Sequence, residues 1–215
     1  MTDMDILQQY MLPGRKQRIE DILSRRTYAM RVVIENLHKE HNVDAVLRTC
    51  DAFGVQHVHI VPQPGDGGVL KTITRGCDRW LTIHQHLTLG ECFRELRELG
   101  FRILAGAFGA GARPVDEMDW DGKVALVFSN EREGACPEVL ENADGLFVIP
   151  LHGFSQSLNV SVAAGIIIHH VHSLKEKAGT LEGLPAPERD ALLDDWSRKS
   201  VKNSEGILDE LRSRK

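Results

Sequence analysis

The stretch Gly153-Phe-Ser-Gln-Ser-Leu-Asn-Val-Ser-Val-Ala-Ala-Gly165 joins two apolar runs of the chain. The run before it, residues 145–150, is short enough for a buried strand, and the run after it, residues 160–172, is long enough for a helix. Small hydroxyl and amide side chains crowd the junction, although a surface turn needs none of them. Such groups at the start of a helix are suited to hold a polar ligand against exposed backbone N–H groups. The stretch therefore predicts a ligand site where a strand leads into a helix.

Strand-like and helix-like patterns alternate along the rest of the chain. Strands are predicted at residues 30–35, 57–61, 80–84, 101–108, 123–128 and 145–149, and helices at 4–26, 42–52, 88–99, 137–142, 160–172 and 188–215. Several strands are continuous apolar runs, a pattern typical of parallel strands that are covered on both faces. We therefore predict an α/β fold with a mostly parallel sheet covered by helices on both faces, and helical extensions at both ends. The predicted divisions are a basic N-terminal extension at 1–28, a central domain at 29–178, and a linker with a helical tail at 179–215.

The composition is that of a globular cytoplasmic protein. The chain has 215 residues, of which 42% are apolar and 27% charged. It has no apolar run long enough to span a bilayer, and its first residues lack the basic and apolar regions of a signal peptide. The four cysteines are far apart without Cys-x-x-Cys spacing, which favours reduced thiols in the cytosol.

A basic segment near the N-terminus contrasts with the acidic chain as a whole. The net charge is −5, yet six basic residues and only two acidic ones lie between Gly14 and Arg31. A basic arm on an acidic body can contact phosphates, and a solvated helix face explains the same charges equally well. If the chain binds nucleic acid, we expect the contacts to come from Arg15, Arg18, Arg25, Arg26, His41, Arg198, Lys199 and Lys202.

Two patterns that resemble known motifs fail on spacing. The glycines at positions 106, 109 and 111 have the wrong order of intervals for a dinucleotide fingerprint, and Pro114 follows where a helix should begin. The ten histidines include pairs at strand spacing, but none has a third ligand at a familiar distance. We therefore predict no dinucleotide site and no metal site.

Polar residues in two further segments are candidates for the site. Asn42 and Arg48 are six residues apart, which places them about 240° from each other around a helix axis. Asn42 or His41 is predicted near the helix cap, and Arg48 needs a partner that could be a carboxylate or a phosphate. Glu131 follows a predicted strand, at the edge of the sheet where parallel folds bind their ligands.

The three segments together resemble the motifs of a known family. Asn42-x-x-Ala45-x-x-Arg48-Thr, then Asn-Glu131-x-x-Gly134, then Ile149-Pro-x-x-Gly153-x-x-x-Ser157-Leu-Asn159-Val-Ser161 resemble the three motifs of the SpoU-type RNA 2′-O-ribose methyltransferases, of the knotted SPOUT superfamily. The likeness covers residues 31–177, in the family's order and spacing. The short basic N-terminal helix and helical tail look most like the branch that methylates guanosine 18 of tRNA.

The resemblance implies a fold, a cofactor and a set of roles. It implies a homodimer, a trefoil knot near the C-terminus, and S-adenosylmethionine held by loops that include Gly106, Ser129, Ile149 and Leu158. The residues expected to act on the substrate are Asn42, Arg48, Glu131, Ser157 and Asn159. Arg48 is expected either to remove the 2′-hydroxyl proton or to clamp a phosphate, and a guanidinium resists deprotonation.

Three departures from the family pattern bear on affinity. Glu40 stands where many relatives have Pro, Ser129 replaces a common Gly, and Gly106 stands where close relatives often have Thr. Two alternatives remain open: the same chemistry on ribosomal RNA or another tRNA site, and an RNA-binding protein of this fold that no longer methylates. An oxidoreductase with a nicotinamide cofactor is the least favoured reading.

Overall fold

The computed structural model describes residues 3–37, 39–62, 78–130 and 133–213, which fall into two compact units. The larger unit is Thr27–Glu182, and the smaller combines Met1–Arg26 with Gly183–Lys215. The two ends of the chain thus belong to one unit, although they are far apart in sequence. The candidate site lies in the larger unit.

A seven-stranded parallel sheet forms the centre of the larger unit, as far as the chain is described. Its strand order is β3-β2-β1-β6-β4-β7-β5, and every neighbouring pair is parallel. The strands are β1 (Thr27–Glu35), β2 (Val55–Val61), β3 (Thr82–Gln85), β4 (Arg102–Gly106), β5 (Arg113–Pro114), β6 (Val124–Phe128) and β7 (Gly145–Val148). The parallel sheet predicted from the apolar runs is confirmed.

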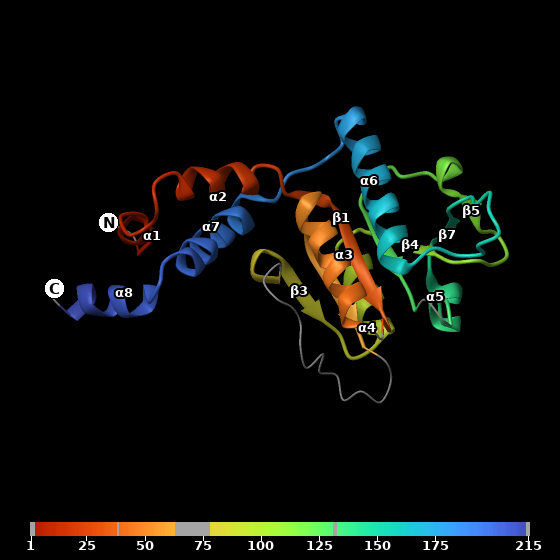
Figure 1. Cartoon of the computed structure of the whole chain (residues 1–215), viewed down its shortest axis with the longest axis horizontal. Coiled ribbons are helices and arrows are strands. Elements are labelled where there is room, and N and C mark those ends of the chain that lie inside the picture. Colours follow the sequence, from red (N-terminus) through yellow and green to blue (C-terminus); the bar gives the residue numbers. More distant parts are fainter. Residues whose placement is uncertain (1–2, 38, 63–77, 131–132, 214–215) are drawn as a thin grey trace. The chain divides into compact units, whose positions relative to one another are not determined.

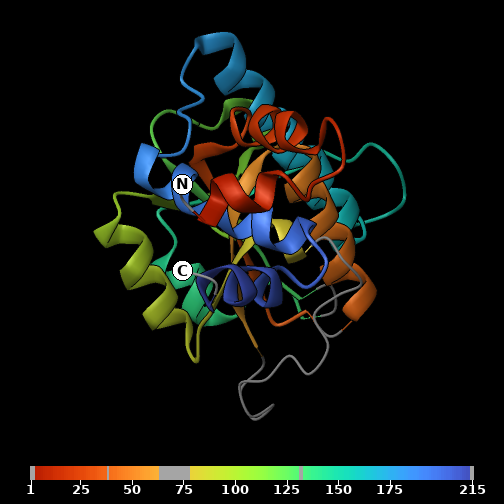
Figure 2. The ribbon, with the colours of Figure 1, turned by 90° about the vertical axis from the view of Figure 1, so that its left-hand side faces the viewer.

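Helices cover both faces of this sheet, because successive side chains of a strand point to opposite sides. Val32 and Ile34 of β1 pack with α3 (Glu40–Ala52) and α6 (Val160–Ala178), whereas Val33 packs with α4 (Leu89–Glu98) and α5 (Pro137–Asn142). Figure 1 shows α3 and α6 side by side, and Figure 2 shows α3 (orange) and α4 (yellow-green) on opposite sides of the strands. Two short 3-10 helices, η1 (Asp78–Trp80) and η2 (Val115–Glu117), also belong to the described part of this unit.

Several predicted boundaries are wrong for local reasons. Helix α3 begins at Glu40 after an extended Lys39, so Asn42 lies in its first turn and the N-cap position belongs to Lys39. The edge strand β5 was not predicted, because two residues containing a proline carry no periodic pattern. Helix α6 continues beyond residue 172 to Ala178, where Gly179 ends it with a φ of 68°.

The described part of the smaller unit contains four short helices where two long ones were predicted. The N-terminal helix is divided into α1 (Asp3–Gln8) and α2 (Arg15–Leu23), with Gly14 at a φ of 76° between them. The tail is divided into α7 (Ala186–Ser200) and α8 (Ser204–Ser213), with Asn203 at a φ of 58°. A small apolar cluster joins α1 to the tail through Leu7, Val201 and Leu208. Among the described helices of the whole chain, none has the length and apolar character that a membrane crossing requires.

Candidate active site

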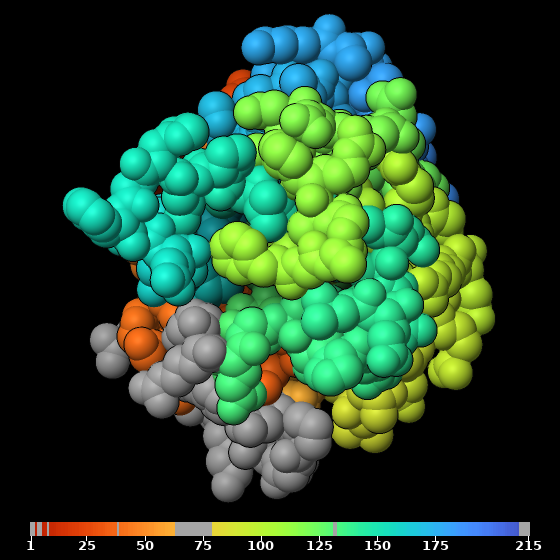
Figure 3. Space-filling view, turned by 90° about the vertical axis from the view of Figure 1, so that its right-hand side faces the viewer, coloured from red at the N-terminus to blue at the C-terminus, as the bar shows by residue number. Residues whose placement is uncertain are grey.

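A cavity of about 540 Å³ opens at the carboxyl edge of the sheet. It is bordered by the segments that follow β4, β6 and β7, and Figure 3 shows this face hollowed between the first of these (yellow-green) and the last (cyan-green). The four residues predicted to bind the cofactor all line it, and so does one predicted to act on the substrate: Gly106, Ser129, Ile149, Leu158 and Ser157. The volume suits a nucleoside-sized ligand.

The inner wall of the cavity is apolar and leaves little room at Gly106. Phe128, Phe147, Val160 and Ile167 provide this wall. A Cβ atom added at Gly106 would lie 3.2 Å from the Phe147 ring, closer than ordinary van der Waals contact. The glycine therefore allows the Phe147 ring to pack against the backbone at this point, and a threonine here would require the ring to move.

Asn159 connects the start of α6 to α3. Its Oδ1 accepts hydrogen bonds from the Ser161 backbone N–H at 2.9 Å and from the Ser161 hydroxyl at 2.6 Å, so Asn159 is the N-cap of α6. Its Nδ2 donates to Oδ1 of Asn42 at 3.2 Å. Asn42 is only 1% exposed. The structure thus brings together two residues that are 117 positions apart in the sequence.

Arg48 lies apart from this amide pair. It is exposed on α3, whereas Asn42 is buried on the same helix, as expected from their angular separation. Neither residue is among those that line the cavity. The geometry therefore places Arg48 where it can meet a large external ligand or a second protein chain.

The segment after β6 is fastened to the end of β1 by Asn130. The Asn130 Nδ2 donates to the Asn36 carbonyl at 3.1 Å, and its Oδ1 accepts from the Glu133 backbone N–H at 3.2 Å. A further bond from the Gly134 N–H to the Asn130 carbonyl closes the turn, with Gly134 at a φ of 73°. Glu131, predicted from the second motif, lies outside the described residues. Asn130 is part of the second motif, but no role was predicted for it, although asparagine in a turn often bonds nearby backbone in this way.

Glu35 was also not predicted, although it stands directly behind the cavity wall. It is the last residue of β1 and is 5% exposed. Burial raises the pKa of its carboxyl, while the Ser129 hydroxyl, the Cys136 thiol and the Asn130 backbone counteract that rise and Glu133 adds to it. All four of these residues belong to the segment that follows β6. In the sequence, the one sign that Glu35 belongs near the site was a carboxylate at the end of an apolar strand.

Some of the residues predicted to contact RNA are exposed, and others are engaged in contacts within the smaller unit. Arg18, Arg25 and Lys202 are exposed, as is His41 in the larger unit. Arg26 is buried, with its guanidinium 5.2 Å from the centre of the Trp196 ring, and its predicted contact with RNA stays a prediction. Arg198 pairs with Asp194, Glu205 and Asp3, and these carboxylates raise its pKa. Lys199 pairs with Asp195 at 2.6 Å, and the Arg15 Nε donates to Ser200.

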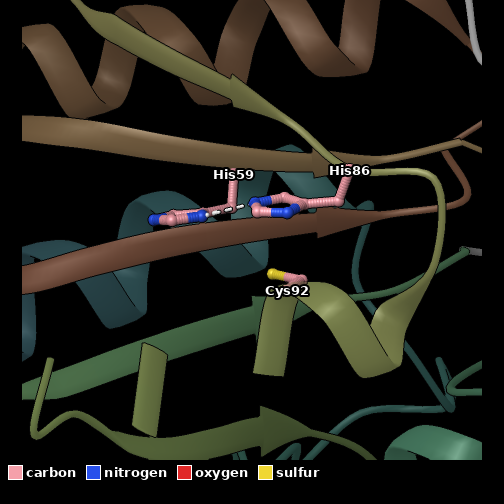
Figure 4. A group of neighbouring side chains, drawn as sticks. All are labelled: His59, His86 and Cys92. Atoms are coloured by element: carbon pink, nitrogen blue, oxygen red, sulfur yellow. Dashed lines mark hydrogen bonds between the residues drawn. The ribbon is translucent and has the colours of Figure 1, made fainter. Parts of the chain in front are cut away.

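A buried group of histidines beneath α4 contains the ligand types of a metal site. Potential ligand atoms of His59, His86 and Cys92 lie within 4.8 Å of one another (Figure 4). However, the His59 Nε2 is 3.1 Å from a guanidinium nitrogen of Arg31, which can only donate. That assignment places a proton on the His59 Nδ1, which then donates to the His86 Nε2 at 2.8 Å. His59 therefore has no lone pair left for a metal, and we interpret the group as a hydrogen-bonded cluster.

Comparison with known proteins identifies the family. The model of the SpoU rRNA methylase family matches residues 29–169. A tRNA (guanosine(18)-2′-O)-methyltransferase of Thermus thermophilus is 40% identical over 188 residues, covering 86% of this chain and 97% of that protein. The enzyme of the same name from Escherichia coli is 34% identical, covering 85% and 82%. The crystal structure of the A. aeolicus TrmH/SpoU tRNA modifying enzyme is 31% identical, covers 92% of this chain and 100% of that one, and superimposes with a TM-score of 0.77. The chain therefore belongs to the SpoU methylase family.

Proposed function

We propose that the protein transfers a methyl group from S-adenosylmethionine to the 2′-hydroxyl of guanosine 18 in the D-loop of tRNA. The observation that carries this proposal is the convergence of the described parts of all three motifs. Residues of the second and third motifs line one cavity, and Asn159 of the third is bonded to Asn42 of the first. The relatives from Thermus thermophilus and Escherichia coli are named for the same reaction and cover most of this chain.

The cavity fits the cofactor of this reaction. Gly106, Ile149 and Leu158 would hold it through backbone and apolar contacts, in a space of nucleoside size. The Ser129 hydroxyl is buried in the cavity wall and has no well-aligned hydrogen bond within the described residues, so its oxygen is available to a ligand. When bound, S-adenosylmethionine supplies an electrophilic methyl group.

The polar residues around the cavity would position the ribose and manage its proton. A ribose hydroxyl is a weak acid, so alignment and stabilisation of the developing negative charge supply most of the catalysis. Asn42, Asn159 and Ser157 offer neutral donors and acceptors for alignment, and Glu131 of the second motif is proposed to complete them. The exposed guanidinium of Arg48 would hold the substrate phosphate and stabilise the alkoxide, since deprotonation of arginine is costly.

Two features of the assembly belong to the same proposal. The segment between β4 and β5 must cross the end of β7, because β7 pairs with both strands. The chain between β7 and α6 would pass through the loop that this crossing segment forms, and would so form the trefoil knot. A homodimer would bring Arg48 of one copy near the cavity of the other, and tRNA as substrate would place the enzyme in the cytoplasm.

The proposed activity is tested by methyl transfer to unmodified tRNA transcripts. Labelled S-adenosylmethionine, purified protein and the transcript are incubated, and ribose methylation is mapped on the product. We expect label on guanosine 18 with the native chain and none with Arg48→Ala. Arg48→Lys should also lose most of the activity, because a lysine cannot bind a phosphate in the bidentate way.

Other outcomes would separate the alternatives. Label on ribosomal RNA or on another tRNA nucleotide would keep the chemistry and overturn the substrate. The absence of label on any RNA, together with retained RNA binding, would support a binding protein that does not methylate.

A further inference from the structure

Glu35 is the last residue of β1, and Ser129 directly follows the last residue of the adjacent parallel strand β6. Ile34 of β1 is paired with Phe128 of β6, so Glu35 and Ser129 each follow one residue later in the same register. Phe128 packs toward α3 and α6, and alternation therefore directs Ser129 to the opposite face of the sheet, the one that Glu35 also faces. Neighbouring strands are about 4.8 Å apart, which brings the two side chains within reach of each other.

The two side chains are buried and incompletely bonded. Ser129 is 7% exposed and Glu35 is 5% exposed. Within the described residues, the Ser129 Oγ and the Glu35 Oε2 have no well-aligned hydrogen bond, although they are close enough for the hydroxyl to influence the pKa of the carboxyl. Buried polar groups without partners are rare in folded proteins, because each costs its full desolvation.

The two residues stand in different relation to the cavity. Ser129 is in its wall, whereas Glu35 is behind the wall and does not line it. The remaining groups that face Glu35 are the Cys136 thiol, the Asn130 backbone and the acidic side chain of Glu133. Ser129 is thus the one residue of this pair that can touch a ligand, and Glu35 can act only through it.

We propose that the Ser129 hydroxyl, oriented by Glu35, accepts a hydrogen bond from a hydroxyl or amino group of the bound cofactor. This inference rests on the proposed function. Ser129 donates its own proton to the Glu35 carboxyl and so presents its oxygen lone pairs to the cavity. Ser129 is then a direct contact, and Glu35 is a positioning residue. A glycine at this position would offer the ligand no side-chain acceptor, so the serine adds affinity that a backbone site lacks.

The test is a double-mutant cycle on cofactor binding, without RNA. The dissociation constants for S-adenosylmethionine and S-adenosylhomocysteine are measured by titration calorimetry for the native chain, Ser129→Ala, Glu35→Ala and the double variant. Ser129→Ala should weaken binding about threefold to tenfold, the range of one net hydrogen bond. Glu35→Ala should weaken it similarly alone, and have no further effect once Ser129 is alanine.

Conservative variants and a matched control distinguish positioning from general destabilisation. Glu35→Gln and Ser129→Thr keep the acceptor and the hydroxyl, and each should restore most of the affinity. His59 is buried and is not among the residues that line the cavity, so His59→Asn should lower the melting temperature and leave the dissociation constant unchanged.

Two results would overturn the inference alone: Ser129→Ala that binds as tightly as the native chain, or Glu35→Ala that weakens binding equally with and without the serine. A native chain that binds neither compound would overturn the proposed function, and this inference with it.

Discussion

At the scale of single residues, Asn159 serves both the fold and the proposed chemistry. Its carbonyl oxygen caps α6 through Ser161, and its amide nitrogen binds Asn42 on α3. The two roles use different atoms of one side chain, so they can be separated by substitution. The motif Ser157-Leu-Asn159 is for this reason informative in the sequence: the asparagine is needed where the helix starts and where the ligand is expected.

Substitution of Asn159 should separate stability from activity. Asn159→Ala removes the cap and should lower the free energy of unfolding by about 1 kcal/mol, together with methyl transfer. Asn159→Ser is a competent cap but too short to reach Asn42, so it should restore the stability and leave the transfer rate low. Urea unfolding and single-turnover methylation of tRNA measure the two quantities. Recovery of both by serine would contradict a role for the Asn42 contact.

At the scale of elements, a polar cluster supports α4 on the edge of the sheet. His57 and His59 of β2 are hydrogen-bonded to His84 of β3 and to His86, which follows β3. Glu95 of α4 is within 4.0 Å of His84 and His86, and within 3.9 Å of Arg31. The paired histidines fix the register between β2 and β3, because each ring nitrogen must find its partner across the strands.

This cluster should make the fold sensitive to acid. Burial lowers the pKa of His59 to about 2, and the pKa of His86 is lowered as well. Below pH 6.5 the unfolded chain therefore takes up a proton at His59 that the folded chain excludes. Each unit of pH below that value should lower the free energy of unfolding by about 1.4 kcal/mol for this residue alone, and above it the contribution is constant.

Urea unfolding between about pH 7.5 and pH 5 tests this expectation. The His59→Asn variant should be less stable at neutral pH and should show a shallower pH dependence than the native chain. Comparison of the two chains isolates His59 from the other titrating groups. Identical slopes for both would contradict the assignment of a neutral, buried imidazole.

Predictions from the sequence were correct where a structural element depends on a local pattern of residue types. The continuous apolar runs predicted the central strands. The helix predicted at residues 88–99 is α4 at Leu89–Glu98, and Thr88 is its N-cap, whose hydroxyl oxygen accepts a hydrogen bond from the Glu91 N–H at 3.2 Å. Predictions failed where the answer depends on residues distant in sequence. The partnership of Asn42 with Asn159, and of Glu35 with the segment after β6, arises only once β1 and β6 are adjacent. The buried position of Arg26 depends similarly on Trp196, 170 residues later.

At the scale of the whole molecule, an exposed apolar stripe on α6 remains to be explained. Val162 is 50% exposed and Ile166 is 42% exposed. Four residues apart, they share one face of the helix, and α6 packs beside α3, which carries the exposed Arg48. Exposed aliphatic side chains that share one helix face are typical of an interface between protein chains. The proposed homodimer provides a partner for this face.

Charge placed on this stripe should separate the two copies without unfolding either. The double variant Val162→Asp, Ile166→Asp alters side chains that are already half exposed, so the melting temperature should change little. Light scattering after size exclusion should give twice the mass of one chain for the native protein and a single mass for the variant. Because Arg48 is proposed to serve the cavity of the other copy, methyl transfer should be lost together with the dimer.

A mixture of this variant with Arg48→Ala should remain inactive, since the Val162→Asp, Ile166→Asp chain cannot associate. A variant that becomes monomeric and stays active would show that one chain carries a complete site, and Arg48 would then have to reach the substrate within its own protomer.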